Sequence, residues 1–128
     1  MSKKILVVDD EEFVLKALSD KLQQSGFEVF EASDGEEGLD AAFKNHPDLI
    51  LLDVVMPKMD GIEVMKKLRQ DNWGKDVPLI LLTRLEPDDN MLQEIIANKP
   101  TYYLVKSNYR IEDVVNKVKE KLGMPVEE

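Results

Sequence analysis

The sequence predicts an open α/β fold, a doubly wound parallel sheet of five strands with helices on both faces. Short apolar runs alternate with amphipathic segments of helical spacing, and this alternation repeats five times along the chain. Strict alternation is typical of a parallel sheet covered by helices and connected by right-handed crossovers. Five strands are too few to close an eight-stranded barrel, so we expect the sheet to be open.

The predicted strands fall into two classes. Three runs contain only Ile, Leu and Val, namely Ile5–Val8, Leu49–Leu52 and Leu79–Leu82. Continuous apolar runs of this length are typical of strands buried on both faces of a sheet. Phe27–Glu31 and Tyr102–Val105 contain more polar or amphipathic side chains, which indicates strands at the two edges.

Amphipathic helices are predicted after each strand. The clearest places apolar side chains on one face at Ile111, Val114, Val115, Val118 and Leu122. Asp34 and Asp60 are each followed three residues later by glutamate, which is typical of a capped helix start. Gly26 is expected to end the first helix, and Pro87 to lie in the first turn of the fourth.

Composition excludes several classes of protein. The 128 residues suit one domain, and without cysteine no disulfide or zinc-thiolate site can form. The 17 basic and 26 acidic side chains give a net charge of −9, which argues against binding to DNA or to anionic membranes. The apolar runs are shorter than a secretory signal or a membrane span. We therefore expect a cytoplasmic protein with one domain at 1–123 and a C-terminal tail at 124–128.

Polar residues directly follow four of the predicted strands. Asp9 and Asp10 follow the first strand, Asp53 the third, Thr83 the fourth and Lys106 the fifth. Each has a simpler interpretation alone, because Asp9, Asp10 and Thr83 could cap helices and Lys106 could be a solvated charge. Together, however, they lie where open α/β sheets carry their sites.

This combination of groups indicates phosphoryl chemistry. Three neighbouring carboxylates repel one another unless a cation neutralises them, and Mg²⁺ prefers such oxygen ligands. A cation opposite a hydroxyl and an ammonium group suits the binding of a phosphoryl group. An aspartate can serve as the nucleophile, and Asp53 follows the central strand.

The same residues lie in motifs that resemble the receiver domain of response regulators in two-component signalling, of the single-domain chemotaxis type. The matching stretches are Ile5–Asp10, Leu52–Gly61, Thr83 and Tyr103–Lys106. The resemblance covers nearly the whole chain and implies a flavodoxin-like sheet with strand order 2-1-3-4-5. It implies a phosphorylation-dependent switch that accepts a phosphoryl group on Asp53 from a sensor histidine kinase or a histidine phosphotransfer protein.

The resemblance also implies a magnesium site. Asp10 and Asp53 would bind Mg²⁺ directly, Asp9 would bind it largely through water, and the backbone carbonyl of Val55 would complete the protein ligands. Lys106 would then pair with the acyl phosphate.

The resemblance further implies a switch with an output face. Thr83 would move toward the phosphoryl group, and Tyr103 would be the aromatic switch residue. The face formed by the fourth helix, fifth strand and fifth helix would then bind a downstream protein. No direct nucleic-acid or membrane partner is expected, and the chain is expected to be a monomer or weak dimer. We expect no enzymatic activity beyond Mg²⁺-dependent self-phosphorylation and self-dephosphorylation.

Two positions depart from the pattern of this family. Arg84 follows Thr83 where a small residue is usual, and it could shield the phosphoryl site, bind it or point to solvent. Ser107 follows Lys106 where a proline is usual. In addition, Val55 and Leu85 flank the expected path of the hydrolytic water, and because they are apolar we expect slow loss of the phosphoryl group.

Three alternative functions can be compared with the sequence. A degenerate receiver could bind partners without phosphorylation. A metal-dependent phosphatase would need an acid–base carboxylate two residues after the nucleophile, where this chain has Val55. An FMN-binding electron carrier would need a Ser/Thr/Gly-rich phosphate loop after the first strand, which the chain lacks.

Overall fold

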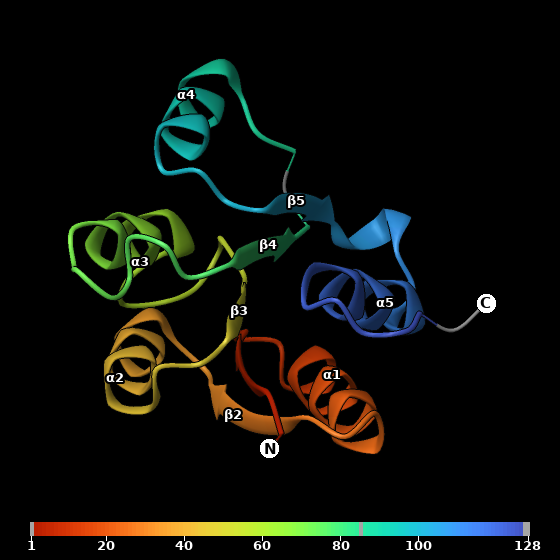
Figure 1. Ribbon diagram of the computed structural model, residues 1–128. Coiled ribbons are helices and arrows are strands. Elements are labelled where there is room, and N and C mark those ends of the chain that lie inside the picture. The colour runs from red at the N-terminus through yellow and green to blue at the C-terminus, as the bar shows by residue number, and fades with distance from the viewer. Residues whose placement is uncertain (1, 85, 127–128) are drawn as a thin grey trace.

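Five parallel strands form one sheet in the order β2-β1-β3-β4-β5 in the computed structural model, which describes residues 2–84 and 86–126 (Figure 1). The strands are β1 (Lys4–Val8), β2 (Glu28–Ala32), β3 (Leu49–Leu52), β4 (Leu79–Thr83) and β5 (Tyr102–Val105). This confirms the predicted order 2-1-3-4-5, with the two more polar strands at the edges. β2 begins one residue later than the sequence predicts.

Five α-helices cover the two faces of the sheet (Figure 1). They are α1 (Glu12–Gln24), α2 (Gly35–Asn45), α3 (Gly61–Arg69), α4 (Asp89–Ala97) and α5 (Ile111–Lys121), with a short 3-10 helix, η1 (Lys106–Asn108), after β5. Buried side chains of α2, α3 and α4 join one core cluster, and those of α1 and α5 join the other. The sheet lies between these two clusters because side chains on successive strand residues point to opposite faces.

The helix starts follow the predicted capping residues, with one exception. Asp34 and Asp60 each accept a hydrogen bond from the backbone N–H three residues later, at 2.8 and 2.9 Å. The prediction for Pro87 was wrong, because this residue precedes α4 instead of forming its first turn. Asp88 caps α4 by accepting from the Met91 N–H at 2.8 Å, so the carboxylate determines the start of the helix.

The end of α5 is closed by the chain that follows it. Gly123 has a φ of 72°, and the Met124 N–H donates to the Lys119 carbonyl oxygen at 2.8 Å. A glycine in this conformation allows the next residue to satisfy a free helix carbonyl. The expected domain boundary after residue 123 stays a prediction, and residues 127 and 128 of the expected tail lie outside the described part.

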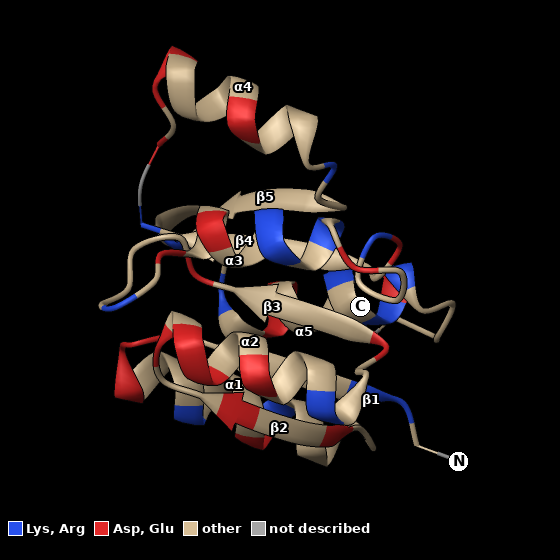
Figure 2. Cartoon of the chain, turned by 90° about the vertical axis from the view of Figure 1, so that its left-hand side faces the viewer, with Lys and Arg blue, Asp and Glu red and all other residues tan. Residues whose placement is uncertain are grey.

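Acidic residues predominate over basic ones in Figure 2, in keeping with the net charge of −9. They occur on the helices and at the strand ends, whereas the basic residues are dispersed among them. In the part of the chain that the structure describes, no helix is long and apolar enough to cross a membrane.

The helix α4 is less deeply packed than the other four. Ile95 is its only buried residue, whereas Leu92 and Ile96 are 39% and 59% exposed. An open groove of about 940 Å³ lies between α3 and α4. The Lys66–Glu94 ion pair crosses this groove at 2.8 Å, but such exposed pairs contribute little to stability.

Arg69, the last residue of α3, fixes the C-terminal end of α4. Its guanidinium donates to the carbonyl oxygens of Asn98 and Lys99, just beyond α4, at 2.8 and 3.2 Å. It also donates to the carbonyl oxygens of Gly74 and Val77, between α3 and β4, at 2.7 and 2.9 Å. One side chain thus satisfies four backbone acceptors, and a lysine cannot reproduce this planar fork of donors.

We expect Arg69→Lys to lower the free energy of unfolding by about 2–4 kcal/mol, because several charged hydrogen bonds are lost. Amide hydrogen exchange should also accelerate in the C-terminal half of α4. Arg110→Lys is the matched control, since the Arg110 side chain is 80% exposed and its ion pair is weak. Urea denaturation and hydrogen exchange measure both effects, and equal losses in the two variants would contradict this role of Arg69.

Candidate functional site

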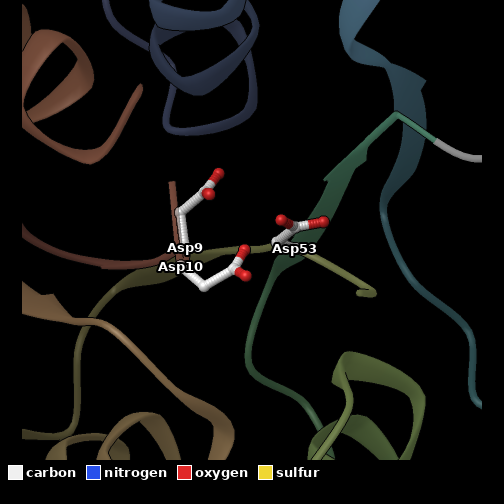
Figure 3. A group of neighbouring side chains, drawn as sticks. All are labelled: Asp9, Asp10 and Asp53. Carbon is white, nitrogen blue, oxygen red and sulfur yellow. The ribbon is translucent and has the colours of Figure 1, made fainter. Parts of the chain in front are cut away.

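Three carboxylates converge at the carboxyl edge of the sheet. Asp9 and Asp10 extend from the end of β1 and Asp53 from the end of β3, as Figure 3 shows. One ligand oxygen from each lies within 4.8 Å of the others. Asp9 and Asp53 are buried and Asp10 is exposed, so the group is accessible to solvent from one side. This arrangement of hard oxygen donors could hold a divalent cation such as Mg²⁺ or Ca²⁺.

The positively charged side chain of Lys106 lies among these carboxylates and partly neutralises them. Its Nζ lies 2.9 Å from Asp9 Oδ2, 3.2 Å from Asp53 Oδ2 and 3.0 Å from Glu11 Oε1. Its side chain is only 14% exposed, so the interpretation as a solvated strand-end charge was wrong. Burial lowers the pKa of Lys106, but hydrogen bonds to Asp9 and Glu11 and the nearby charge of Asp53 outweigh it, and the pKa is raised.

Both oxygens of Asp9 are engaged in hydrogen bonds. Oδ1 accepts from the Glu11 N–H at 2.9 Å, and Oδ2 accepts from Lys106. Burial nevertheless raises the pKa of Asp9 to about 6, with a further contribution from Asp53, against the lowering effect of its two donors. Neither Asp9 nor Asp10 caps α1, whose N-cap residue is Glu11.

Asp53 is held by the backbone around it. Its N–H donates to the Val8 carbonyl oxygen at 2.9 Å, and its Oδ1 accepts from the Val55 N–H at 3.3 Å. The chain then folds back, and the Gly61 N–H donates to the Val54 carbonyl oxygen at 2.8 Å. A Cβ at position 61 would overlap the Asp53 carbonyl oxygen, so glycine is needed for this close approach.

The loop between β3 and α3 is also tied to α2. The Lys58 Nζ lies 3.4 Å from Asp34 Oδ2, and Lys58 has a φ of 69°. At the same place a Cβ on Gly35 would overlap the Met59 carbonyl oxygen. These contacts hold the loop that carries Val55 against the start of α2.

Thr83 and Tyr103 share one face of the sheet. Thr83 is the fully buried last residue of β4, and it pairs with Val105 in the register in which Leu81 pairs with Tyr103. Residues two apart point to the same face, which here carries α2, α3 and α4. Burial raises the pKa of Tyr103, with further contributions from the charges of Asp53 and Glu86.

Sequence analysis missed Glu11, the third carboxylate at Lys106. The hydrogen bond to Lys106 is the main cause that lowers the pKa of Glu11, and Arg84 contributes. The Arg84 Nη1 lies 3.4 Å from Glu11 Oε1, so Arg84 is exposed but paired. The sequence shows only a run of four acidic residues, Asp9 to Glu12, which does not single out Glu11.

The structure also locates Val55 and Ser107, two further residues that the sequence analysis singled out. Val55 is half-buried, and Leu85 lies outside the described residues. No peptide bond between described residues is cis, so the bond from Lys106 to Ser107 is trans. Ser107 itself is exposed and lies in η1.

The sequence profile of the response regulator receiver domain matches residues 5–119. The chain belongs to this family. Its solved structural neighbours include the chemotaxis protein CheY4 of Vibrio cholerae, with 35% identity and a TM-score of 0.84 over 94% of this chain and 98% of that one. Another is a CheX–CheY–BeF3–Mg complex of Borrelia burgdorferi, with 25% identity and a TM-score of 0.81 over 94% of this chain and 89% of that one.

A curated relative is the alkaline phosphatase synthesis transcriptional regulatory protein PhoP of Bacillus subtilis. It is 54% identical over 83 residues, which are 65% of this chain and 34% of PhoP. The aligned part is thus about a third of that relative's length. Receiver domains belong to two-component systems, interact with histidine kinases and downstream targets, and are typically not enzymes apart from self-phosphorylation.

We expect Asp9→Asn to stabilise this receiver domain at pH 7 without divalent metal, by about 1–3 kcal/mol. The pKa of Asp9 is about 6 in the folded chain against an ordinary value of 3.8. The folded state therefore binds more protons between these values, and the wild type loses stability as the pH rises from about 4 to about 6.

Denaturation in EDTA at pH 4 and pH 7 measures this effect. The advantage of Asp9→Asn should be present at pH 7 and nearly absent at pH 4. Asp34→Asn is the control, because Asp34 is also buried but its pKa is lowered, mainly by the Glu37 N–H. A gain of equal size in both variants would contradict the explanation.

Proposed function

We propose that this receiver domain is a phosphorylation-dependent switch whose phosphoacceptor is Asp53. The observation that carries the proposal is the position of Asp53, buried at the end of the central strand with Lys106 Nζ 3.2 Å from its Oδ2. The donor would be the phosphohistidine of a sensor histidine kinase or of a histidine phosphotransfer protein. A carboxylate oxygen of Asp53 forms the new P–O bond as the P–N bond breaks, and the leaving imidazole retains or takes up a proton.

We propose Mg²⁺ as the cation of the acidic group. Asp10 and Asp53 would bind it directly with the backbone carbonyl of Val55, and Asp9 would act through water. The donors to Asp9 support this division, because they lie 2.9 Å from each of its oxygens. The donors to the two oxygens of Asp53 are farther away, at 3.3 and 3.2 Å, and are more easily replaced by a metal. When bound, the metal shields the charge between an acceptor carboxylate and an incoming phosphate.

The chain's own groups would bind the rest of the phosphoryl group. Lys106 would contact one oxygen, and the Thr83 hydroxyl would turn toward another. Thr83 and Tyr103 share a face of the sheet, so movement of Thr83 would open space into which the Tyr103 ring could turn. The change would favour one of two existing conformations and alter the α4–β5–α5 face, which would bind a downstream protein. We propose that the chain binds neither nucleic acid nor membranes directly. We also propose that it is a monomer or a weak dimer.

We propose the receiver domain at residues 1–123 and a tail at 124–128, with no catalytic activity beyond Mg²⁺-dependent self-phosphorylation and self-dephosphorylation. We also propose that the phosphoryl group on Asp53 is hydrolysed slowly, because the apolar side chains of Val55 and Leu85 flank the expected path of the water. The alternative function is a degenerate receiver that binds partners without phosphorylation. The unusual residues Arg84 and Ser107 keep this alternative open. The complete set of Asp9, Asp10, Asp53, Thr83 and Lys106 argues against it.

The first test is phosphorylation by acetyl phosphate in Mg²⁺, read by intact mass. We expect one added phosphoryl group in the wild type and none in Asp53→Asn, because the amide cannot act as the nucleophile. Asp40→Asn is the matched control on the exposed face of α2, and it should be phosphorylated normally. Undiminished labelling of Asp53→Asn would reject the acceptor, and a wild type that stays unlabelled would favour the degenerate receiver.

The second test is Mg²⁺ binding by calorimetry. Asp10→Ala should abolish measurable binding because a direct ligand is lost. Asp9→Ala should weaken binding by about tenfold, as is usual for a group that acts through another ligand. If both variants lose the same affinity, the distinction between direct and water-mediated ligands is wrong.

A further inference from the structure

Glu11 is the least buried of the three carboxylates that contact Lys106. Its side chain is 37% exposed, against 3% for Asp9 and 2% for Asp53. The oxygen Oε1 of Glu11 lies 3.0 Å from Lys106 Nζ and 3.4 Å from Arg84 Nη1. A single carboxylate oxygen therefore joins two cations that follow the neighbouring strands β4 and β5.

A phosphoryl group on Asp53 would disturb this arrangement. The ammonium of Lys106 has three N–H donors, and three carboxylates surround it. Phosphorylation turns the Asp53 carboxylate into an acyl phosphate, so the donor that Asp53 held can pass to one phosphoryl oxygen. A second phosphoryl oxygen can contact Lys106 only if Asp9 or Glu11 leaves it. Glu11 loses least by leaving, because water can solvate its exposed carboxylate, whereas Asp9 would become an unpaired buried charge.

We propose that Glu11 is an internal competitor of the phosphoryl group for Lys106 and Arg84. In the unphosphorylated chain the Glu11 carboxylate occupies both cations. When Asp53 is phosphorylated, Glu11 leaves both, and Arg84 becomes a ligand of the phosphoryl oxygens. This inference rests on the proposed function of Asp53.

The chemistry of Arg84 supports the exchange. A guanidinium presents a planar fork of donors that matches phosphoryl oxygens. A phosphoryl group carries about −1.5 to −2 charges, more than a single carboxylate. Arg84 directly follows Thr83 at the end of β4, so its backbone is fixed beside the site, and its side chain is 59% exposed and can turn.

The test uses beryllofluoride with Mg²⁺, a non-covalent mimic of the phosphoryl group, and measures its affinity by titration. Glu11→Gln should tighten binding by about two- to fivefold, the size expected for loss of one competing exposed ion pair. Glu12→Gln is the matched control, because it removes the same charge from an exposed neighbour that has no ion pair with any described residue.

Arg84→Gln should weaken beryllofluoride binding by about two- to fivefold. Its effect should be larger in the Glu11→Gln background, where Arg84 need not first leave a carboxylate. Lys75→Gln removes the same charge from an exposed position and should change little. The Nε–H NMR signal of Arg84 should also shift on addition of beryllofluoride, which a residue with only a structural role would not show.

Two results would overturn the inference. If Glu11→Gln behaves like Glu12→Gln, Glu11 does not compete with the phosphoryl group. If Arg84→Gln leaves the affinity unchanged or tightens it, Arg84 at most shields the site. Failure of the proposed function is distinguishable, because the wild type itself would then bind no beryllofluoride and gain no Asp53-dependent mass with acetyl phosphate.

Discussion

The repulsion among carboxylates at the carboxyl edge of the sheet is the constraint on which the site depends. Asp9 and Asp53 are buried at the ends of two adjacent strands, where ionised groups are costly unless a cation is close. Lys106, whose side chain is 14% exposed, places its ammonium within 3.2 Å of both carboxylates. Against the effect of burial, the contacts with Asp9, Glu11 and Asp53 raise the pKa of Lys106. Burial raises the pKa of Asp9 to about 6 even though Lys106 lowers it. The single positive charge of Lys106 therefore does not neutralise the carboxylates around it.

The fold brings these groups together because of strand order, not because of sequence proximity. β1 lies beside β3, and β5 is separated from β3 by β4, so Lys106 must reach across to Asp9 and Asp53. A long flexible side chain can do this, whereas the short aspartates must come from strand ends that are already adjacent. The close approach of Gly61 to the backbone of Asp53 then fixes the position of this carboxylate. The sheet therefore determines which residues are close, and the side-chain lengths determine their contacts.

Strand periodicity and capping residues made most of the fold predictable from the sequence. Continuous apolar runs identified the three central strands, and Asp34 and Asp60 marked two helix starts. Pro87 was assigned wrongly because proline suits both a first turn and the position before a cap, and Asp88 settles the choice only through its hydrogen bond. The roles of Arg69 and Glu11 were not predictable, because they depend on the reach of long side chains to groups distant in sequence. The grouping of Asp9, Asp10, Asp53 and Lys106 was predictable because strand ends fix it, while their roles stay proposals.

The excess of negative charge at the site connects the need for a cation with the proposed switch. Asp9, Asp10, Glu11 and Asp53 face only Lys106 and Arg84 in the described site. Replacing the charge of Asp53 by about −1.5 to −2 on an acyl phosphate makes this excess of negative charge larger. In the proposed switch a divalent cation would offset most of this excess, and release of Glu11 into solvent would offset more. The remaining change would act on Tyr103 and on α4. Burial raises the pKa of Tyr103, and the charge of Asp53 raises it further. The helix α4 has one buried residue, Ile95, and Arg69 fixes its C-terminal end. Under this proposal a charge added at the end of β3 would be most easily accommodated at the α4 side of the sheet, because α4 is the helix least deeply packed.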